Sequence, residues 1–177
     1  SLASNTTGTE NVSVGAFALD ANTTASDNTA CGYNSLGVNT TGANNVAVGS
    51  FALDANTTAS NNTAVGYLAL SENTTGTNLV AVGKGALDAN TTGNSNSALG
   101  IDALGANTTA SNNVAFGDFT LDANTTGANN TGLGSQSLSA NTTANDNTAV
   151  GKSAMGANTT GTGNTALGAE TLESCTT

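Results

Sequence analysis

The residues best suited to chemistry in this chain are four aspartates that recur at an even spacing. They are Asp20, Asp54, Asp88 and Asp122, each 34 residues from the next. Carboxylates share a metal ion only when each of them lies about 2.4 Å from it. If one repeat of the sequence forms one turn of a stack with a strand spacing of about 4.8 Å, neighbouring aspartates lie roughly 9.6 Å apart. We therefore interpret them as a solvated row that keeps like charges off adjacent turns.

The remaining composition argues against catalysis. The chain has no His, and its Ser residues have no base beside them at a spacing typical of a nucleophile. It also lacks the G-G-x-G-x-D repeats of calcium-binding solenoids. We predict a protein that is not an enzyme and that uses no cofactor or metal ion.

The two cysteines are predicted not to pair with each other. Cys31 and Cys175 are 144 residues apart, which corresponds to roughly 40 Å along such a stack. A disulfide requires Cα atoms within about 7 Å. Cys31 occupies a repeat position otherwise held by Val, Leu or Phe, which predicts a small buried hydrophobic side chain. Cys175 is predicted to be a free thiol or an intermolecular bridge.

The charge balance limits the classes of partner. Twelve acidic residues accompany only two cations, Lys84 and Lys152, and the net charge is −10. This balance argues against binding to nucleic acid or to an anionic membrane. No apolar run reaches the length of about 18 residues that membrane insertion requires. The sequence begins without an initiator Met or an apolar leader, which indicates a mature or excised piece. Low charge and abundant Asn, Thr, Ala and Gly favour an extracellular, cell-surface or virion-surface location.

All these residues belong to a unit of 17 residues, NTTGANNVAVGSFALDA at residues 39–55, that recurs ten times without slippage. Leu, Ile, Val and Phe make up only 30 of 177 residues, a fraction typical of disordered chains. A strict repeat argues for order, because each turn buries its faces on its neighbours. We predict one domain over residues 1–177, with coils that begin at Asn5, Asn22, Asn39, Asn56, Asn73, Asn90, Asn107, Asn124, Asn141 and Asn158.

We number the repeat positions from 1 to 17, starting at the opening Asn. Positions 8 to 10 alternate with the period of a strand, and their Val and Thr residues suit one. Gly at position 11 of every copy and the β-branched triplets disfavour a helix. The expected fold is all-β: a single-chain β-solenoid, or β-helix, of ten coils with a thin core of small residues. The apolar positions 10 and 15 should point inward, whereas the variable positions 12 and 13 should face solvent or a partner.

Asn is invariant at position 1 and nearly invariant at position 7, and two explanations are open. Stacked Asn side chains would form amide hydrogen bonds along the axis. Each N-T-T triplet also matches the acceptor pattern for N-glycosylation. One inward-facing Asn cannot serve both purposes, and we favour the stacked row.

Two sets of outward side chains are candidates for binding. Aromatic residues at positions 12 and 13 of the first four coils predict a lateral subunit contact or a sugar-stacking surface, the alternative being rings that only pack on neighbouring corners. These are Phe17, Tyr33, Phe51 and Tyr67. Thr at position 2 forms a regular row of the kind that ice-binding solenoids present, and position 3 would join it only if the chain bends there. The row is Thr6, Thr23, Thr40, Thr57, Thr74, Thr91, Thr108, Thr125, Thr142 and Thr159.

The repeat runs to both ends of the sequence with no recognisable cap. Residues 1–4 fit positions 14 to 17, and residues 175–177 fit positions 1 to 3. Open solenoid ends expose unpaired strand edges that recruit other chains. We expect either a slice of a longer solenoid or a chain that stacks end to end, and both alternatives predict a fibre.

The segment NTAVGYLAL followed by NTTG, within residues 62–76, resembles repeats of bacterial and phage fibre proteins, many of which are tail-fibre or adhesin-like shafts. The N-x-A-x-G element is also similar to the β-roll head repeats of trimeric autotransporter adhesins, although their coil is shorter. The resemblance implies an extracellular shaft and names no receptor. We expect a structural or adhesive fibre that assembles with itself, with cell-surface glycans as a second class of partner. The alternative is an ice-binding protein.

Overall fold

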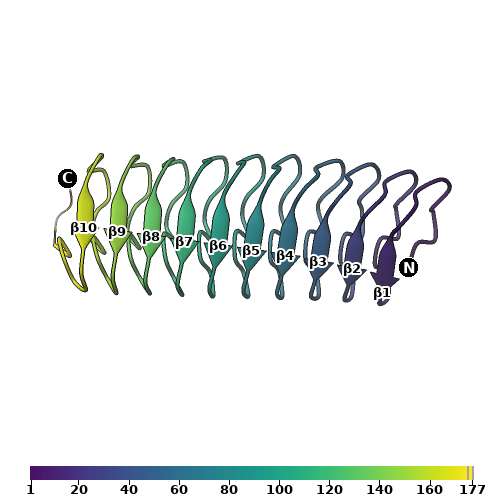
Figure 1. Ribbon diagram of the computed structural model, residues 1–177, viewed down its shortest axis with the longest axis horizontal. Helices are drawn as coiled ribbons and strands as arrows, with labels where there is room; N and C mark the ends of the chain where they lie inside the picture. Colours follow the sequence, from purple (N-terminus) through teal and green to yellow (C-terminus); the bar gives the residue numbers. More distant parts are fainter. Residues whose placement is uncertain (175, 177) are drawn as a thin grey trace.

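The chain winds into an all-β solenoid in which each coil contributes one short strand. The computed structural model describes residues 1–174 and 176, and within them the strands form one parallel sheet in sequence order. The sheet runs the length of the molecule, with the two termini at opposite ends (Figure 1). The strands are β1 Val12–Val14, β2 Thr29–Cys31, β3 Val46–Val48, β4 Thr63–Val65, β5 Val80–Val82, β6 Ser97–Leu99, β7 Val114–Phe116, β8 Thr131–Leu133, β9 Thr148–Val150 and β10 Thr165–Leu167.

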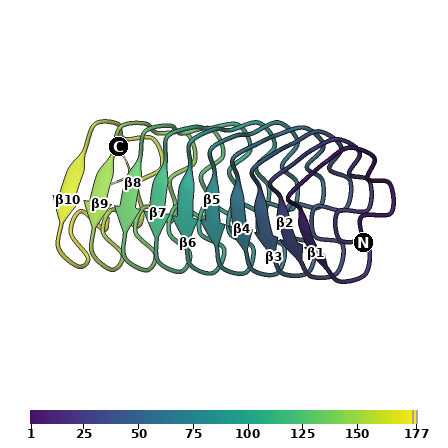
Figure 2. The same cartoon turned by 45° about the vertical axis from the view of Figure 1, so that its right-hand side comes forward.

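The register between neighbouring strands is the same along the whole sheet. Val46 pairs with Thr63 and Ala47 with Ala64, an offset of one repeat, and every other pair of adjacent strands has the same offset. A second view shows the strands stacked on one side and the turns stacked behind them (Figure 2). The prediction of one coil per repeat is confirmed.

Backbone hydrogen bonds between coils continue around the perimeter, well beyond the strands. In the third coil the N–H of Thr40 donates to the carbonyl of Thr57 at 2.8 Å, and that of Leu53 donates to Ala69 at 3.1 Å. The N–H of Gly49 donates in the opposite direction, to Cys31 in the preceding coil, at 2.8 Å. Each coil is therefore held to both neighbours at many points, which compensates for a core too small to supply the usual hydrophobic stabilisation.

The interior is narrow and consists mainly of Ala, Leu and Asn. Ala at position 9, small residues at position 14 and Leu at position 15 are almost all fully buried. Met155 takes the place of Leu in the ninth coil and is also buried. The predicted thin core of small residues is confirmed, as is the inward direction of position 15.

The buried Asn side chains form two hydrogen-bonded rows, of which the row at position 7 is interrupted at Leu79. At position 1, Asn56 Nδ2 donates to Asn39 Oδ1 at 3.0 Å and to the Ala59 carbonyl of its own coil at 3.1 Å. At position 7, the N–H of Asn45 donates to Asn28 Oδ1 at 3.0 Å, and Asn45 Nδ2 donates to the Ala59 carbonyl at 2.9 Å. The predicted stacked rows are confirmed. The Asn of each N-T-T triplet from the second coil to the tenth is buried, so the folded coil offers no room there for a glycan.

Tight turns are made by residues with positive φ at positions 6, 11, 13 and 15. Leu53 at position 15 has a φ of 52°, and Leu occupies the same conformation in most other coils. Left-handed geometry costs a residue with a side chain roughly 1–2 kcal/mol. Burial of Leu inside the coil offsets that cost. Gly49 at position 11 has a φ of 136°, and a Cβ there would collide with the Gly66 carbonyl of the next coil.

The structure contradicts the expectation that position 10 points inward. Val14, Leu99 and Leu167 are 57%, 50% and 76% exposed, and the small Ala at position 9 faces the interior instead. Cys31, also at position 10, is exposed rather than buried. The reason is the narrowness of the coil. Position 9 holds Ala in eight coils, and at Gly132 even a Cβ would lie 2.6 Å from Thr120 Cγ2. The coil has room for only a very small side chain at position 9, so the larger apolar side chain at position 10 lies outside.

Candidate interaction surfaces

The outer side of the sheet, which we call the strand face, consists of positions 8 and 10 of every coil. Position 8 holds Val, Thr or Ser, and position 10 holds Val, Leu, Phe or Cys. None of these twenty residues is charged. With nine intervals of about 4.8 Å, the strand face is roughly 43 Å long. A long exposed apolar surface of this kind marks an interaction site in soluble proteins.

The sequence does not predict the strand face as a site, because the apolar residues at position 10 suggest a core. The overlooked signal is the Ala at position 9, which is replaced only by Ser13 and Gly132. A position restricted to the smallest residues lies where the interior leaves the least room for a side chain. Since side chains alternate along a strand, Ala at position 9 inside places positions 8 and 10 outside.

The four predicted aromatic residues lie side by side in one row. Phe17 and Tyr33 have ring centroids 5.7 Å apart, Tyr33 and Phe51 5.3 Å, and Phe51 and Tyr67 6.4 Å. All three pairs are edge-to-face, an attractive geometry for rings. Phe17, Tyr33 and Tyr67 are about half exposed, so the row both packs on itself and faces solvent. A contact or sugar-binding role for the row stays a prediction.

Both Thr residues of the N-T-T triplet lie at the surface, because the chain bends there. The hydroxyl of Thr40 at position 2 donates to the carbonyl of Thr57 in the next coil at 3.0 Å. Thr41 at position 3 is exposed, as are its counterparts in all nine other coils. The predicted row at position 2 therefore uses its hydroxyls largely to join coils, while the row at position 3 faces solvent.

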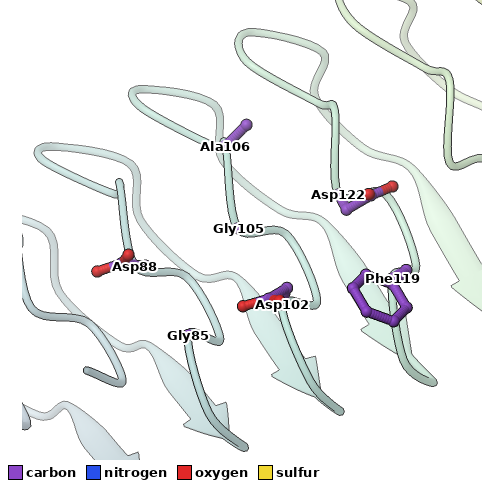
Figure 3. Close-up of a pocket in the computed structure, with 7 residues that line it drawn as sticks. All are labelled: Gly85, Asp88, Asp102, Gly105, Ala106, Phe119 and Asp122. Carbon is purple, nitrogen blue, oxygen red and sulfur yellow. The ribbon is translucent and has the colours of Figure 1, made fainter. Parts of the chain in front are cut away.

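The aspartate row lies along one corner of the solenoid and is partly buried. A notch opens between Asp88 and Asp122 because Gly105 stands between them at position 16, and Asp102 and Phe119 border the notch (Figure 3). The Oδ1 atom of Asp122 is buried without a hydrogen-bond partner. Desolvation by burial raises the pKa of Asp122, and hydrogen bonds from the backbone N–H groups of Asp122 and Ala123 offset part of that rise.

A second aspartate of the row has a similar environment. Burial is the largest cause that raises the pKa of Asp54, and repulsion from Glu72 and Asp88 adds to it. At position 16 of the coil between Asp54 and Asp88 stands Ser71, whose Oγ donates to Asp88 Oδ1. Among residues 1–174, no group of three His, Cys, Asp or Glu side chains lies close enough to hold a metal ion. The same part of the chain contains no helix long and apolar enough to cross a membrane.

Cys175, the predicted intermolecular thiol, lies outside the residues that the structure describes. Comparisons of the chain with protein-family models, with curated proteins and with solved structures find no match in any of the three. The functional argument therefore rests on the geometry of the solenoid and on the composition of its surfaces.

Proposed function

We propose that this chain is a non-enzymatic structural or adhesive segment of an extracellular fibre, carried on a cell or virion surface. The observation that supports this proposal best is the uniform register from β1 to β10, in which the coils repeat nearly the same hydrogen bonds to their neighbours. Such a body is a rod whose cross-section does not change along its length. Its surface chemistry recurs at about every 4.8 Å, which suits repeated contacts with a partner.

The surfaces of the rod support self-association rather than binding to a polyanion. The strand face carries no charge in any coil, while the rest of the chain carries twelve acidic residues and two lysines. Uncharged apolar rows associate through the hydrophobic effect, and surrounding acidic residues keep the remaining surface soluble. We propose that the rods associate side by side or end to end, and that the aromatic row offers a second contact for glycans.

Negative-stain microscopy and small-angle scattering of the full chain test the fibre proposal. We expect straight rods at low concentration and bundles or filaments as the concentration rises. Matched samples in high salt separate the apolar contribution, since salt screens charge repulsion and strengthens apolar contacts. A chain that stays a compact monomer at millimolar concentration, in low salt and in high salt, would contradict self-assembly.

Ice binding is the second candidate, and the exposure of the Thr row at position 3 favours it. Ten coils place Thr at positions 2 and 3 in register at the strand spacing, on a body in which only 8% of the residues are charged. Thermal hysteresis and ice-crystal shaping at millimolar protein provide the test. Thr92→Tyr in the middle of the position 3 row should abolish the effect, whereas Val80→Tyr on the strand face should retain it. Absence of hysteresis in the unmodified chain removes this candidate.

A further inference from the structure

We propose that the strand face is the surface through which two copies of this chain pair, face to face and with their solenoid axes antiparallel. The twofold axis runs along the strand direction at β6, so that each row of one copy lies opposite the same row of the other. This inference rests on the proposed self-association and specifies its contact. It assigns lateral binding to positions 8 and 10, with position 12 at the border.

The size of the surface reaches the minimum that a specific pair requires. A pair centred on β6 overlaps nine coils, β2 to β10, or roughly 38 Å along the axis. Positions 8 to 12 span about 13 Å across, and the row at position 12 borders the sheet and is exposed in most coils. The contact then covers roughly 500 Å² on each chain and about 1,000 Å² in total. A specific interface with good complementarity buries at least about 1,000 Å².

The sizes of the side chains at position 10 favour antiparallel axes. The first half of the row, from Val14 to Val82, contains only Val and Cys. The second half, from Leu99 to Leu167, contains Leu and Phe with a single Val. Reversal of one rod places the half with larger side chains of each copy on the half with smaller side chains of the other. The two sheets then stay an even distance apart. The opposed residues are Cys31 with Leu167, Val48 with Val150, Val65 with Leu133, Val82 with Phe116, and Leu99 with its own copy.

Parallel axes would produce a poorer contact. In that arrangement the twofold axis runs along the solenoid, and position 10 lies opposite position 8. Position 8 is Thr or Ser in six of the ten coils, so hydroxyl groups would face apolar side chains in most of the pair. Buried hydroxyls without partners cost free energy. With antiparallel axes the apolar rows meet each other, and the hydroxyls of position 8 meet residues of position 8.

Charges at the border of the strand face fit the same arrangement. The charged residues at position 12 are Lys84, Asp118 and Lys152, in the fifth, seventh and ninth coils. A twofold axis at β6 places Lys84 of one copy opposite Asp118 of the other, and this pair occurs twice. Lys152 lies opposite the neutral Ser50. At position 6, on the other border, no acidic residue lies opposite another. Complementary rim charges fix register and orientation more than they add affinity.

Sedimentation equilibrium of the full chain tests the surface. The unmodified chain should sediment at twice its monomer mass. Leu99→Lys places two like charges against each other at the twofold axis and should raise the dissociation constant at least a hundredfold. Thr109→Lys adds the same charge at an exposed position outside the strand face and should leave pairing unchanged. Pairing that survives Leu99→Lys would overturn the proposal, provided that circular dichroism shows both variants folded.

Thiol cross-linking tests the orientation. In a background with Cys31→Val and Cys175→Ser, chains carrying Val65→Cys are mixed with chains carrying Leu133→Cys, and a short bismaleimide is added. Antiparallel pairs predict mixed dimers of the two chains. Parallel pairs predict Val65→Cys chains linked to each other, because β4 and β8 are about 19 Å apart along the axis. Predominance of the second product would overturn the antiparallel arrangement.

A charge reversal tests the register. Asp118→Lys lowers the net negative charge and would strengthen association if only overall repulsion mattered. The proposed register predicts instead a three- to tenfold weaker pair, because Lys84 and the new lysine repel twice. Lys84→Asp should also weaken pairing, and the double variant Lys84→Asp with Asp118→Lys should restore it. Failure of the double variant to restore pairing would overturn the register.

These outcomes are distinguishable from failure of the fibre proposal. Filaments that persist under the microscope when Leu99→Lys abolishes the pair would assign assembly to another surface and leave the fibre intact. A chain that neither pairs nor forms filaments at any concentration would remove both proposals.

Discussion

The buried Asn rows and the strand face adjoin each other along the solenoid, yet they differ sharply in how much variation they accept. Position 1 is Asn in all ten coils, whereas position 10 takes Val, Leu, Phe or Cys. A buried amide must satisfy fixed donors and acceptors in its own coil and in both neighbours, and no other side chain does so. An exposed side chain on the strand face must suit only solvent or a partner. Of these two rows, the constant one is fixed by its buried hydrogen bonds, and the apolar one lies at the surface.

Removal of one buried Asn should be the most damaging single change. Asn107 Nδ2 donates to Asn90 Oδ1 at 2.9 Å and to the Ala110 carbonyl at 3.1 Å, and Asn107 Oδ1 accepts from Asn124 at 3.1 Å. Asn107→Ala leaves Asn90 Oδ1 buried without a partner, and it removes one of the two hydrogen bonds of the Ala110 carbonyl and of Asn124 Nδ2. The substitution should lower the free energy of unfolding by about 4 kcal/mol. Urea denaturation measures it, with the exposed Thr109→Ala as a control that changes by less than about 0.5 kcal/mol. Equal losses of stability in the two variants would show that the buried Asn row contributes no more than an exposed side chain.

Two glycines of the sixth coil differ in how well their positions should tolerate a side chain. Gly100 at position 11 has a φ of 138°, and a Cβ there would lie 2.5 Å from the carbonyl of Gly117. Gly105 lacks a positive φ, and its Cβ would lie 3.1 Å from the Asp102 carbonyl oxygen. We expect Gly100→Ala to cost about 3 kcal/mol and Gly105→Ala less than about 1 kcal/mol in the same denaturation assay. A reversed order would show that position 11 tolerates a side chain.

Leu79 is the one interruption of the position 7 row, and its repair should be stabilising. In other coils the Asn Oδ1 at this position accepts from the next coil's backbone, as Asn96 Oδ1 does from the N–H of Asn113 at 2.9 Å. Leu79→Asn would offer the same acceptor to the N–H of Asn96. It would also provide a donor for the Gly93 carbonyl. We expect a gain of about 1 kcal/mol in free energy of unfolding, measured by urea denaturation. A loss instead would show that Leu79 contributes more by apolar packing than an amide would.

Asp122, at the boundary between interior and surface, should give the smallest effect. Because burial raises its folded-state pKa above 3.8, the folded state holds a proton more tightly than the unfolded state. Stability therefore falls as the pH rises from 3.8 through the raised pKa, and it increases on acidification. Asp122→Asn should reduce this pH dependence by a few tenths of a kcal/mol, since the carboxylate is half exposed. Denaturation at pH 7 and at pH 4 measures it, with Thr109→Ala expected to keep the unmodified profile.

Most of the architecture could be predicted from the sequence, because period and hydrogen-bonding groups are visible in it. The 17-residue coil, the strand at positions 8 to 10 and the Asn rows all follow from residues that repeat without slippage. Which side chains of the strand face the interior could not be predicted from apolar character alone, since Val48 and Ala47 both suit a core. The turns could not be predicted either, because Leu normally prefers a negative φ and Leu53 has a φ of 52°. The packing of the whole coil, not local propensity, selects that conformation.

The ladder of bonds between coils also determines how the rod responds to a pull along its axis. Each coil occupies about 4.8 Å of the rod but holds 17 residues, which reach roughly 56 Å when extended. Detachment of one terminal coil therefore releases about 50 Å of chain while the remaining coils keep their register. Because the coils repeat the same bonds, successive ruptures should occur at similar forces and even intervals. A rod of this kind should therefore lengthen in steps of about 50 Å under load rather than unfold all at once.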